Sequence, residues 1–363
     1  MTWILGPHWA AEVGRMPSVN GPEKECVATQ ILRQLPLADK TSVWGTLGTI
    51  RPHLSFDVEK DVQTLLGTVS GRGVDYRTII DLLTNRSNEQ CQQIAKEFLD
   101  FTKQDLLTTL QAAVPANLEG FVAGLLRPAA QYDAHEIKAA LKGPEVETLT
   151  EILCTRTNQQ LREILRFYKN DFKSDFEKDV ASGTSGWLKD LLVALSQGKR
   201  ERYSGVIDYI LIDQDTKALV DADGGGHAGK LQESEWVRIL TQRSPEHLNR
   251  VFSCYQKRRG LPVEEAVQRI FRGQAQAAGL TLVSLLRNTP LYLARKLYQA
   301  VKGPRGNART LARIMISRRE TDLLSVRVEF RKHYGVSLYS FLMAETDGNG
   351  QAAVLGLCRA EDL

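Results

Sequence analysis

One short pattern recurs four times along the chain, and an internal repeat restricts the fold more than any other sequence feature. In each copy a short apolar run leads into an arginine, and these are Arg86, Arg156, Arg243 and Arg318. Successive arginines lie 70, 87 and 75 residues apart. The third copy is the longest because it contains a polar, glycine-rich stretch, residues 221–235, which we expect to be an inserted loop.

Signals for helix starts follow each arginine. Ser87 and Thr157 each have a glutamine three residues later, which predicts capping boxes, and Ser244 is followed by proline at the first helical position. A second start is predicted 19 residues after each arginine, at Asp105, Asp175, Pro262 and Ser337. Strand-like alternation of apolar and polar residues is scarce. We therefore predict an all-α protein with four copies of about five helices each.

Composition excludes several classes of protein. Apolar residues make up 42% of the 363 residues, the formal charge is +4, and no apolar run is long enough to span a bilayer. The charge excess is too small and too dispersed to predict a nucleic-acid partner. Five scattered cysteines and the lack of a secretion signal predict a cytoplasmic protein. No constellation of residues points to catalysis, so we do not expect an enzyme.

The repeated pattern resembles the annexin core. The resemblance rests on the apolar run and its arginine in four copies, and on Glu329–Lys332 followed by Ser337–Ser340. It covers about residues 58–360, and it implies a curved disc whose convex face meets phospholipid headgroups through calcium. The implied parts are a variable N-terminal segment, 1–57, and four repeats, 58–130, 131–203, 204–289 and 290–363.

The resemblance also implies where calcium ligands should lie. The family uses a Lys-Gly-x-Gly loop between the first two helices of a repeat and an acid 27 residues after the repeat arginine. Copy one keeps Gly71 and Gly73, and copy four keeps Gly303 and Glu345. Arg305 replaces the second glycine of copy four, and the other three acid positions hold Ala113, Gly183 and Ile270. No copy keeps both halves, so we expect calcium binding to be weak or absent.

Basic residues stand in the same loops, and a cation near an anionic leaflet contributes about 1 kcal/mol to binding. They are Arg72, Lys142, Lys230, Lys302 and Arg305. We therefore predict a peripheral membrane protein that binds phosphatidylserine or another anionic lipid with little calcium dependence. Scattered surface charge is the alternative interpretation of these residues. The alternative function is a protein-interaction scaffold that has lost membrane binding, with residues 1–57 as the place for a protein partner.

Overall fold

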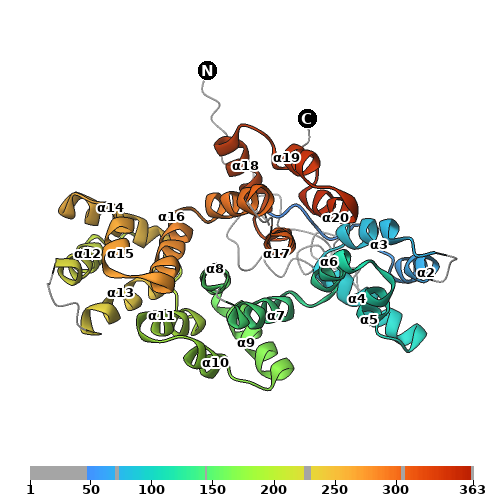
Figure 1. The fold of residues 1–363 in the computed structure, drawn as a ribbon, viewed down its shortest axis with the longest axis horizontal. Helices are drawn as coiled ribbons and strands as arrows, with labels where there is room; N and C mark the ends of the chain where they lie inside the picture. The colour runs from blue at the N-terminus through green and yellow to red at the C-terminus, as the bar shows by residue number, and fades with distance from the viewer. Residues whose placement is uncertain (1–46, 70–72, 144, 225–229, 304–306, 361–363) are drawn as a thin grey trace, which may run out of the picture. The chain divides into compact units, whose positions relative to one another are not determined.

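The structure is a computed structural model that describes residues 47–69, 73–143, 145–224, 230–303 and 307–360. The chain divides into two units, Met1–Thr46 and Leu47–Leu363. The first unit lies outside the described residues, so most of the predicted N-terminal segment 1–57 does as well. In Figure 1 the described helices of the second unit are coloured in chain order, from blue to red.

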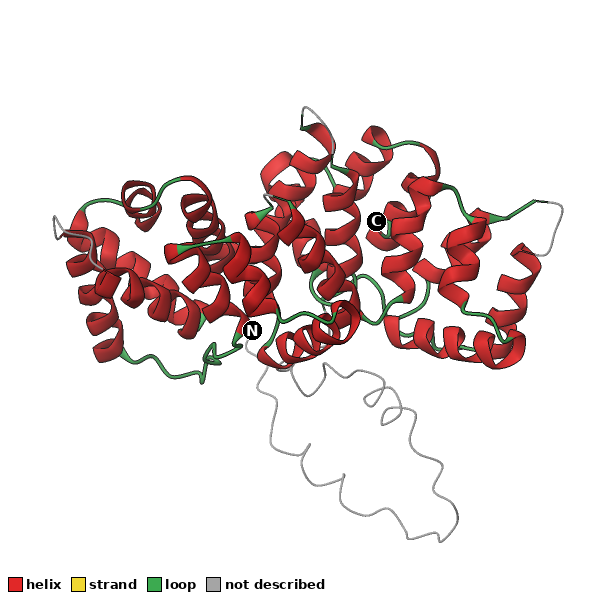
Figure 2. Cartoon of the chain, turned by 60° about the horizontal axis from the view of Figure 1, so that its bottom comes forward, coloured by secondary structure: helices red, strands yellow, loops and turns green. Residues whose placement is uncertain are grey.

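Helices make up each of the four copies (Figure 1), and Figure 2 shows that the segments between them are loops and turns, with no strand in the described part. Copy one contains α2 (Val58–Val69), α3 (Tyr76–Thr84), α4 (Asn88–Thr102), α5 (Leu106–Ala113) and α6 (Ala116–Leu126). Copy two contains α7 (Ala129–Lys142), α8 (Val146–Thr155), α9 (Asn158–Phe172), α10 (Phe176–Gly183) and α11 (Gly186–Ser196).

Copies three and four share one long element. Copy three contains α12 (Tyr209–Gly224), α13 (Lys230–Gln242), α14 (Pro245–Arg259), α15 (Val263–Ile270) and the first part of α16 (Gly273–Lys302). Copy four contains the rest of α16, α17 (Ala308–Arg318), α18 (Leu323–Tyr334), α19 (Leu338–Glu345) and α20 (Gly348–Cys358). The backbone of Asn288 is non-helical, so α16 is two helices joined at a kink. The predicted all-α fold with five helices per copy is confirmed.

The predicted helix starts are also confirmed. Ser87 and Thr157 form complete capping boxes, and the Ser244 hydroxyl accepts a hydrogen bond from the backbone of His247. Asp105 and Ser337 cap α5 and α19 in the same way. The stretch predicted as an inserted loop, residues 221–235, is shorter than expected. Its two ends belong to α12 and α13, and only residues 225–229 lie between these helices.

The apolar interior forms two separate clusters. One cluster joins copies one and four, with Phe98 and Phe330 fully buried in it. The other joins copies two and three around Tyr168, Trp236 and Tyr255. Within each copy the third helix packs against the first, in the pairs α2–α4, α7–α9, α12–α14 and α16–α18. No described helix has the length and apolar character that crossing a bilayer requires.

A buried ion pair connects copy two to copy four. Arg313 on α17 donates to both carboxylate oxygens of Glu151 on α8, and the Nη2–Oε2 distance is 3.0 Å. The two side chains are 3% and 1% exposed. A buried charge is stable only while its partner remains, so this pair fixes the contact between the two copies.

Replacing Glu151→Gln should therefore lower the free energy of unfolding by about 3–5 kcal/mol, because Arg313 would be left buried and unpaired. A urea titration followed by circular dichroism measures the change. Glu264→Gln is the matched control, since Glu264 pairs with Arg287 at a site where both side chains are 34% exposed. The control should cost about 1 kcal/mol or less. Equal losses in the two variants would contradict this role for Glu151.

Candidate calcium and membrane-contact loops

The four positions predicted to carry a calcium-binding acid are structurally equivalent. Each is the last residue of the fourth helix in its copy, and the four are Ala113, Gly183, Ile270 and Glu345. The register is the same because the residue 19 positions after each repeat arginine precedes the first helical residue, and each helix is eight residues long. Only copy four therefore presents a carboxylate at this helix end.

In copy four the acid and the loop lie together. Lys302 is the last residue of α16, and its Nζ lies 2.6 Å from Oε2 of Glu345. Gly303 follows, and its N–H donates to the carbonyl of Gln299 at 2.8 Å. A Cβ at Gly303 would lie only 2.5 Å from that carbonyl oxygen, so a side chain does not fit. Glu345 thus already has a cationic partner from the predicted loop, and Arg305 lies outside the described residues.

In copy two the nearby acid belongs to a side-chain network. Lys142 ends α7 and is exposed, and Gly183 at the equivalent helix end offers no carboxylate. One turn back from each, Nζ of Lys138 lies 2.6 Å from Oδ2 of Asp179. Hydrogen bonds from Lys138, Tyr168 and Ser174 lower the pKa of Asp179 to about 2. This carboxylate therefore stabilises the packing of α7, α9 and α10.

Copies one and three present apolar side chains at the helix end. In copy one Gly73 is exposed, but Asp75 nearby caps α3 by accepting a hydrogen bond from the backbone N–H of Thr78 at 3.0 Å. That bond is the main reason why the pKa of Asp75 is lowered. Gly71 and Arg72 lie outside the described residues. In copy three Lys230 is the first residue of α13, and its side chain is not described.

Three of the four helix ends lack the carboxylate that a calcium shell typically uses. Calcium takes six to eight oxygen ligands, typically including a bidentate carboxylate. Ala113, Gly183 and Ile270 supply no carboxylate, and the carboxylate of Glu345 is paired with Lys302. Among the described residues no group of three or more His, Cys, Asp or Glu side chains is placed to hold a metal ion.

The repeat arginines have a role that the sequence interpretation missed. Arg86 and Arg156 each bind, through Nε and Nη2, both oxygens of a carboxylate on the first helix of their own copy, Asp61 and Asp133. The signal was present in the sequence as an acid 23–28 residues before the first three arginines. Arg318 differs, since its partner is Asp322, four residues later. In copies one to three the arginine therefore holds the end of the second helix against the first helix of the same copy.

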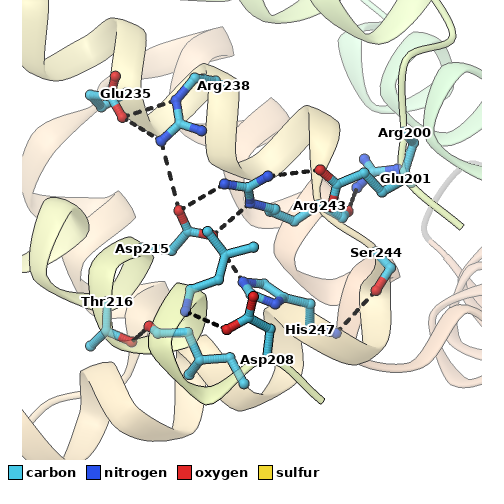
Figure 3. Close-up of polar contacts among 12 residues, drawn as sticks. Arg200, Glu201, Asp208, Asp215, Thr216, Glu235, Arg238, Arg243, Ser244 and His247 are labelled. Carbon is cyan, nitrogen blue, oxygen red and sulfur yellow. Dashed lines mark hydrogen bonds and ion pairs between the residues drawn. The ribbon is translucent and has the colours of Figure 1, made fainter. Parts of the chain in front are cut away.

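In copy three the repeat arginine, Arg243, and its partner Asp215 belong to a larger cluster of polar side chains (Figure 3). Nε of Arg243 lies 2.7 Å from Oδ2 of Asp215, and Nε2 of His247 lies 2.9 Å from the same oxygen. Nη1 of Arg243 also lies 2.7 Å from Glu201, and Arg238 joins Asp215 to Glu235. The side chain of Asp215 is only 2% exposed, so its charge is balanced inside the protein.

A restored acid should restore calcium binding in copy one. Ala113→Glu places a carboxylate at the helix end of the copy that keeps both glycines, so the affinity for calcium should rise on the order of tenfold. Calorimetric titration with calcium measures this. Ala112→Glu adds the same charge one residue earlier on α5 and is the matched control. No difference between the two variants would contradict the assignment of position 113.

The comparisons with known proteins agree with this architecture. The annexin family model matches residues 60–125, 132–195, 226–282 and 292–357. Annexin A9 of Mus musculus is 51% identical over 345 residues, which are 94% of this chain and 99% of that protein. Annexin A9 of Homo sapiens is 50% identical over 350 residues, which are 96% of this chain and 100% of that protein.

Two solved structures show the same fold. Annexin III superposes with a TM-score of 0.83 at 33% identity, over 89% of this chain and 100% of that one. Chicken annexin V superposes with a TM-score of 0.77 at 34% identity, over 87% of this chain and 100% of that one. The family model matches four segments of the chain, and the relatives align over nearly its full length. The copies of five helices agree with both findings. The chain belongs to the annexin family.

Proposed function

We propose that this chain is a peripheral membrane protein of the cytoplasm that binds anionic phospholipid through basic loops, with weak or no calcium dependence. Annexins as a family bind anionic phospholipid membranes, generally with calcium, and are generally not enzymes. The proposal of weak or absent calcium dependence rests on the side chains at the four helix ends. Three lack a carboxylate, and the fourth carboxylate is bound to Lys302.

Charge in the loops supports a direct contact with headgroups. Lys142 ends α7 with an exposed side chain, and the described residues offer it no ion-pair partner. Such a lysine can donate to a lipid phosphate or carboxylate at little cost in desolvation. Lys302 is partly neutralised by Glu345. Lys142 is therefore the described loop cation that should contribute most, with Arg72, Lys230 and Arg305 as further proposed contacts.

The proposed contact is electrostatic, so it should weaken as salt screens it. Exposed charges separated by more than about 8 Å are largely screened at physiological ionic strength. A calcium bridge would behave differently, because chelation would remove it. Sedimentation with phosphatidylserine vesicles in chelator, at low and physiological salt, separates these cases. Failure to bind vesicles under every condition would favour the alternative, a protein-interaction scaffold with residues 1–57 as the proposed site for a partner.

Lys142→Gln should weaken binding to phosphatidylserine vesicles in chelator about fivefold, since one loop cation contributes about 1 kcal/mol. Cosedimentation at low salt, with the vesicle concentration varied, measures the change. Lys96→Gln is the control, because Lys96 is an exposed lysine on the third helix of copy one. Equal weakening by both substitutions would mean that net charge, and not the loop, governs binding.

A further inference from the structure

The exposed side of α9, the third helix of copy two, carries a row of basic side chains. They lie four, three and four residues apart, so they fall on one side of the helix and span about 16 Å along its axis. All four are exposed, and we call them the α9 stripe: Arg162, Arg166, Lys169 and Lys173. The apolar side chains of α9 are buried on the other side, and α9 packs against α7.

The charges of the α9 stripe are not balanced by neighbouring acids. Within the described residues no member of the stripe forms an ion pair, because the nearby carboxylates are engaged elsewhere. Glu163 accepts a hydrogen bond from Nε2 of Gln159 at 3.3 Å, and Oδ2 of Asp171 accepts one from Gln131 at 2.8 Å. Asp175 caps α10. The stripe is therefore a line of positive charge at the surface.

The other three copies provide an internal comparison. The stripe residues lie 6, 10, 13 and 17 positions after the repeat arginine of copy two, and the equivalent positions hold two cations in copy one, none in copy three and one in copy four. In chain order these positions are occupied by Gln92, Lys96, Leu99, Lys103, Asn249, Ser253, Gln256, Gly260, Leu324, Val328, Arg331 and Gly335. The scaffold does not require the basic residues, because three copies form the same helix without the full set.

Lys173 stands where glycine would be less strained. It follows the last residue of α9 with a φ of 51°, in the left-handed region. At the equivalent positions Gly260 and Gly335 have φ values of 72° and 73°, and Lys103 of copy one has a φ of 59°. An L side chain is less stable than glycine in this conformation, so the turn itself does not explain the lysine.

The surface beside the stripe is polar. An open hollow of about 340 Å³ lies against its first half and is lined by Gln159, Arg162, Glu163 and Arg166. The guanidinium carbon of Arg166 lies 5.5 Å from the centroid of the Phe167 ring, a contact that orients the group without using its N–H donors. None of the large apolar side chains of α9 is exposed. A partner at this surface would therefore be held by charge and hydrogen bonds.

A row of cations one helix wide fits an elongated anionic partner. The axial steps between neighbouring side chains are about 6.0, 4.5 and 6.0 Å, which are also the steps between acids at i, i+4, i+7 and i+11 of a second helix. Clusters of basic residues are a recurring means of recognising acidic protein segments. Single-stranded nucleic acid also requires aromatic side chains on which bases stack, and the aromatic side chains of α9 are buried or half-buried.

We propose that the α9 stripe is a docking surface for an acidic helix of another protein, whose carboxylates lie one turn apart and pair with the four basic side chains. The contact involves none of the helix-end loops and does not depend on membrane binding. Because exposed ion pairs are individually weak and are screened by ions, binding should be reversible and sensitive to salt.

The test uses the full chain and two labelled peptides, with binding followed by fluorescence anisotropy. One alanine-rich helical peptide carries glutamates at i, i+4, i+7 and i+11, and the other has the same composition with the glutamates distributed around the helix. The patterned peptide should bind at least about fivefold more tightly at low salt, because only its carboxylates can face the whole stripe at once. Its affinity should fall at physiological salt.

The double variant Arg166→Glu and Lys173→Glu should lose about tenfold or more in affinity for the patterned peptide, since two of the four pairs become repulsive. Lys96→Glu with Lys103→Glu is the matched control. These lysines occupy the equivalent positions of copy one, Lys103 has the same backbone conformation as Lys173, and the net charge changes by the same amount. The control should stay within about twofold of the wild type. Circular dichroism checks that both variants retain their helices.

Three results would overturn the proposal. Equal binding of the two peptides, or equal losses in the two double variants, would mean that net charge alone governs binding. Cosedimentation with phosphatidylserine vesicles that is lost selectively in the stripe variant would assign the stripe to lipid. Tighter binding of a single-stranded oligothymidylate than of the patterned peptide would assign it to nucleic acid.

Discussion

Arginine–carboxylate pairs fix the helices of this protein relative to one another. In copies one to three the repeat arginine binds an acid on the first helix of the same copy, as Arg156 binds Asp133 with both side chains less than a tenth exposed. Arg313 and Glu151 extend the principle to the contact between copies two and four. Loss of either partner of a buried pair strongly destabilises the folded state, so these residues constrain the fold.

The helix-end loops are free of that constraint. The residue at the end of the fourth helix contributes to no buried pair in any copy, so Ala113, Gly183 and Ile270 can replace an acid without affecting the scaffold. Replacing the acid removes a negative charge from the helix end. In copy four the Glu345 carboxylate meets an ammonium group where calcium would need it as a ligand. The fold therefore does not depend on a carboxylate at these helix ends.

The sequence predicted what local chemistry determines. Helix starts at Asp105, Asp175 and Ser337 follow from a side chain that satisfies the first backbone N–H groups, which depends on the neighbouring residues alone. The shared register of the four helix ends also followed from spacing. The length of the inserted loop was overestimated, because helices α12 and α13 continue into polar sequence.

Long-range contacts could not be predicted in the same way. The pairing of Lys302 with Glu345 joins residues 43 positions apart, and the cluster around Asp215 brings together α12, α13 and α14. The division of the interior into two apolar clusters likewise depends on which copies meet. Sequence periodicity also did not predict that Val206 and Ile210 are 73% and 74% exposed, because tertiary packing decides which apolar side chains between two copies are buried.

The most direct test of this account is the affinity of the full chain for phosphatidylserine vesicles, measured by cosedimentation in chelator and in 1 mM calcium at the same ionic strength. Because three helix ends lack a carboxylate and the fourth is paired with Lys302, we expect the two affinities to agree within about threefold. Binding that is absent in chelator and appears with calcium, a change of about a hundredfold or more, would contradict the account and show that these loops still hold the ion.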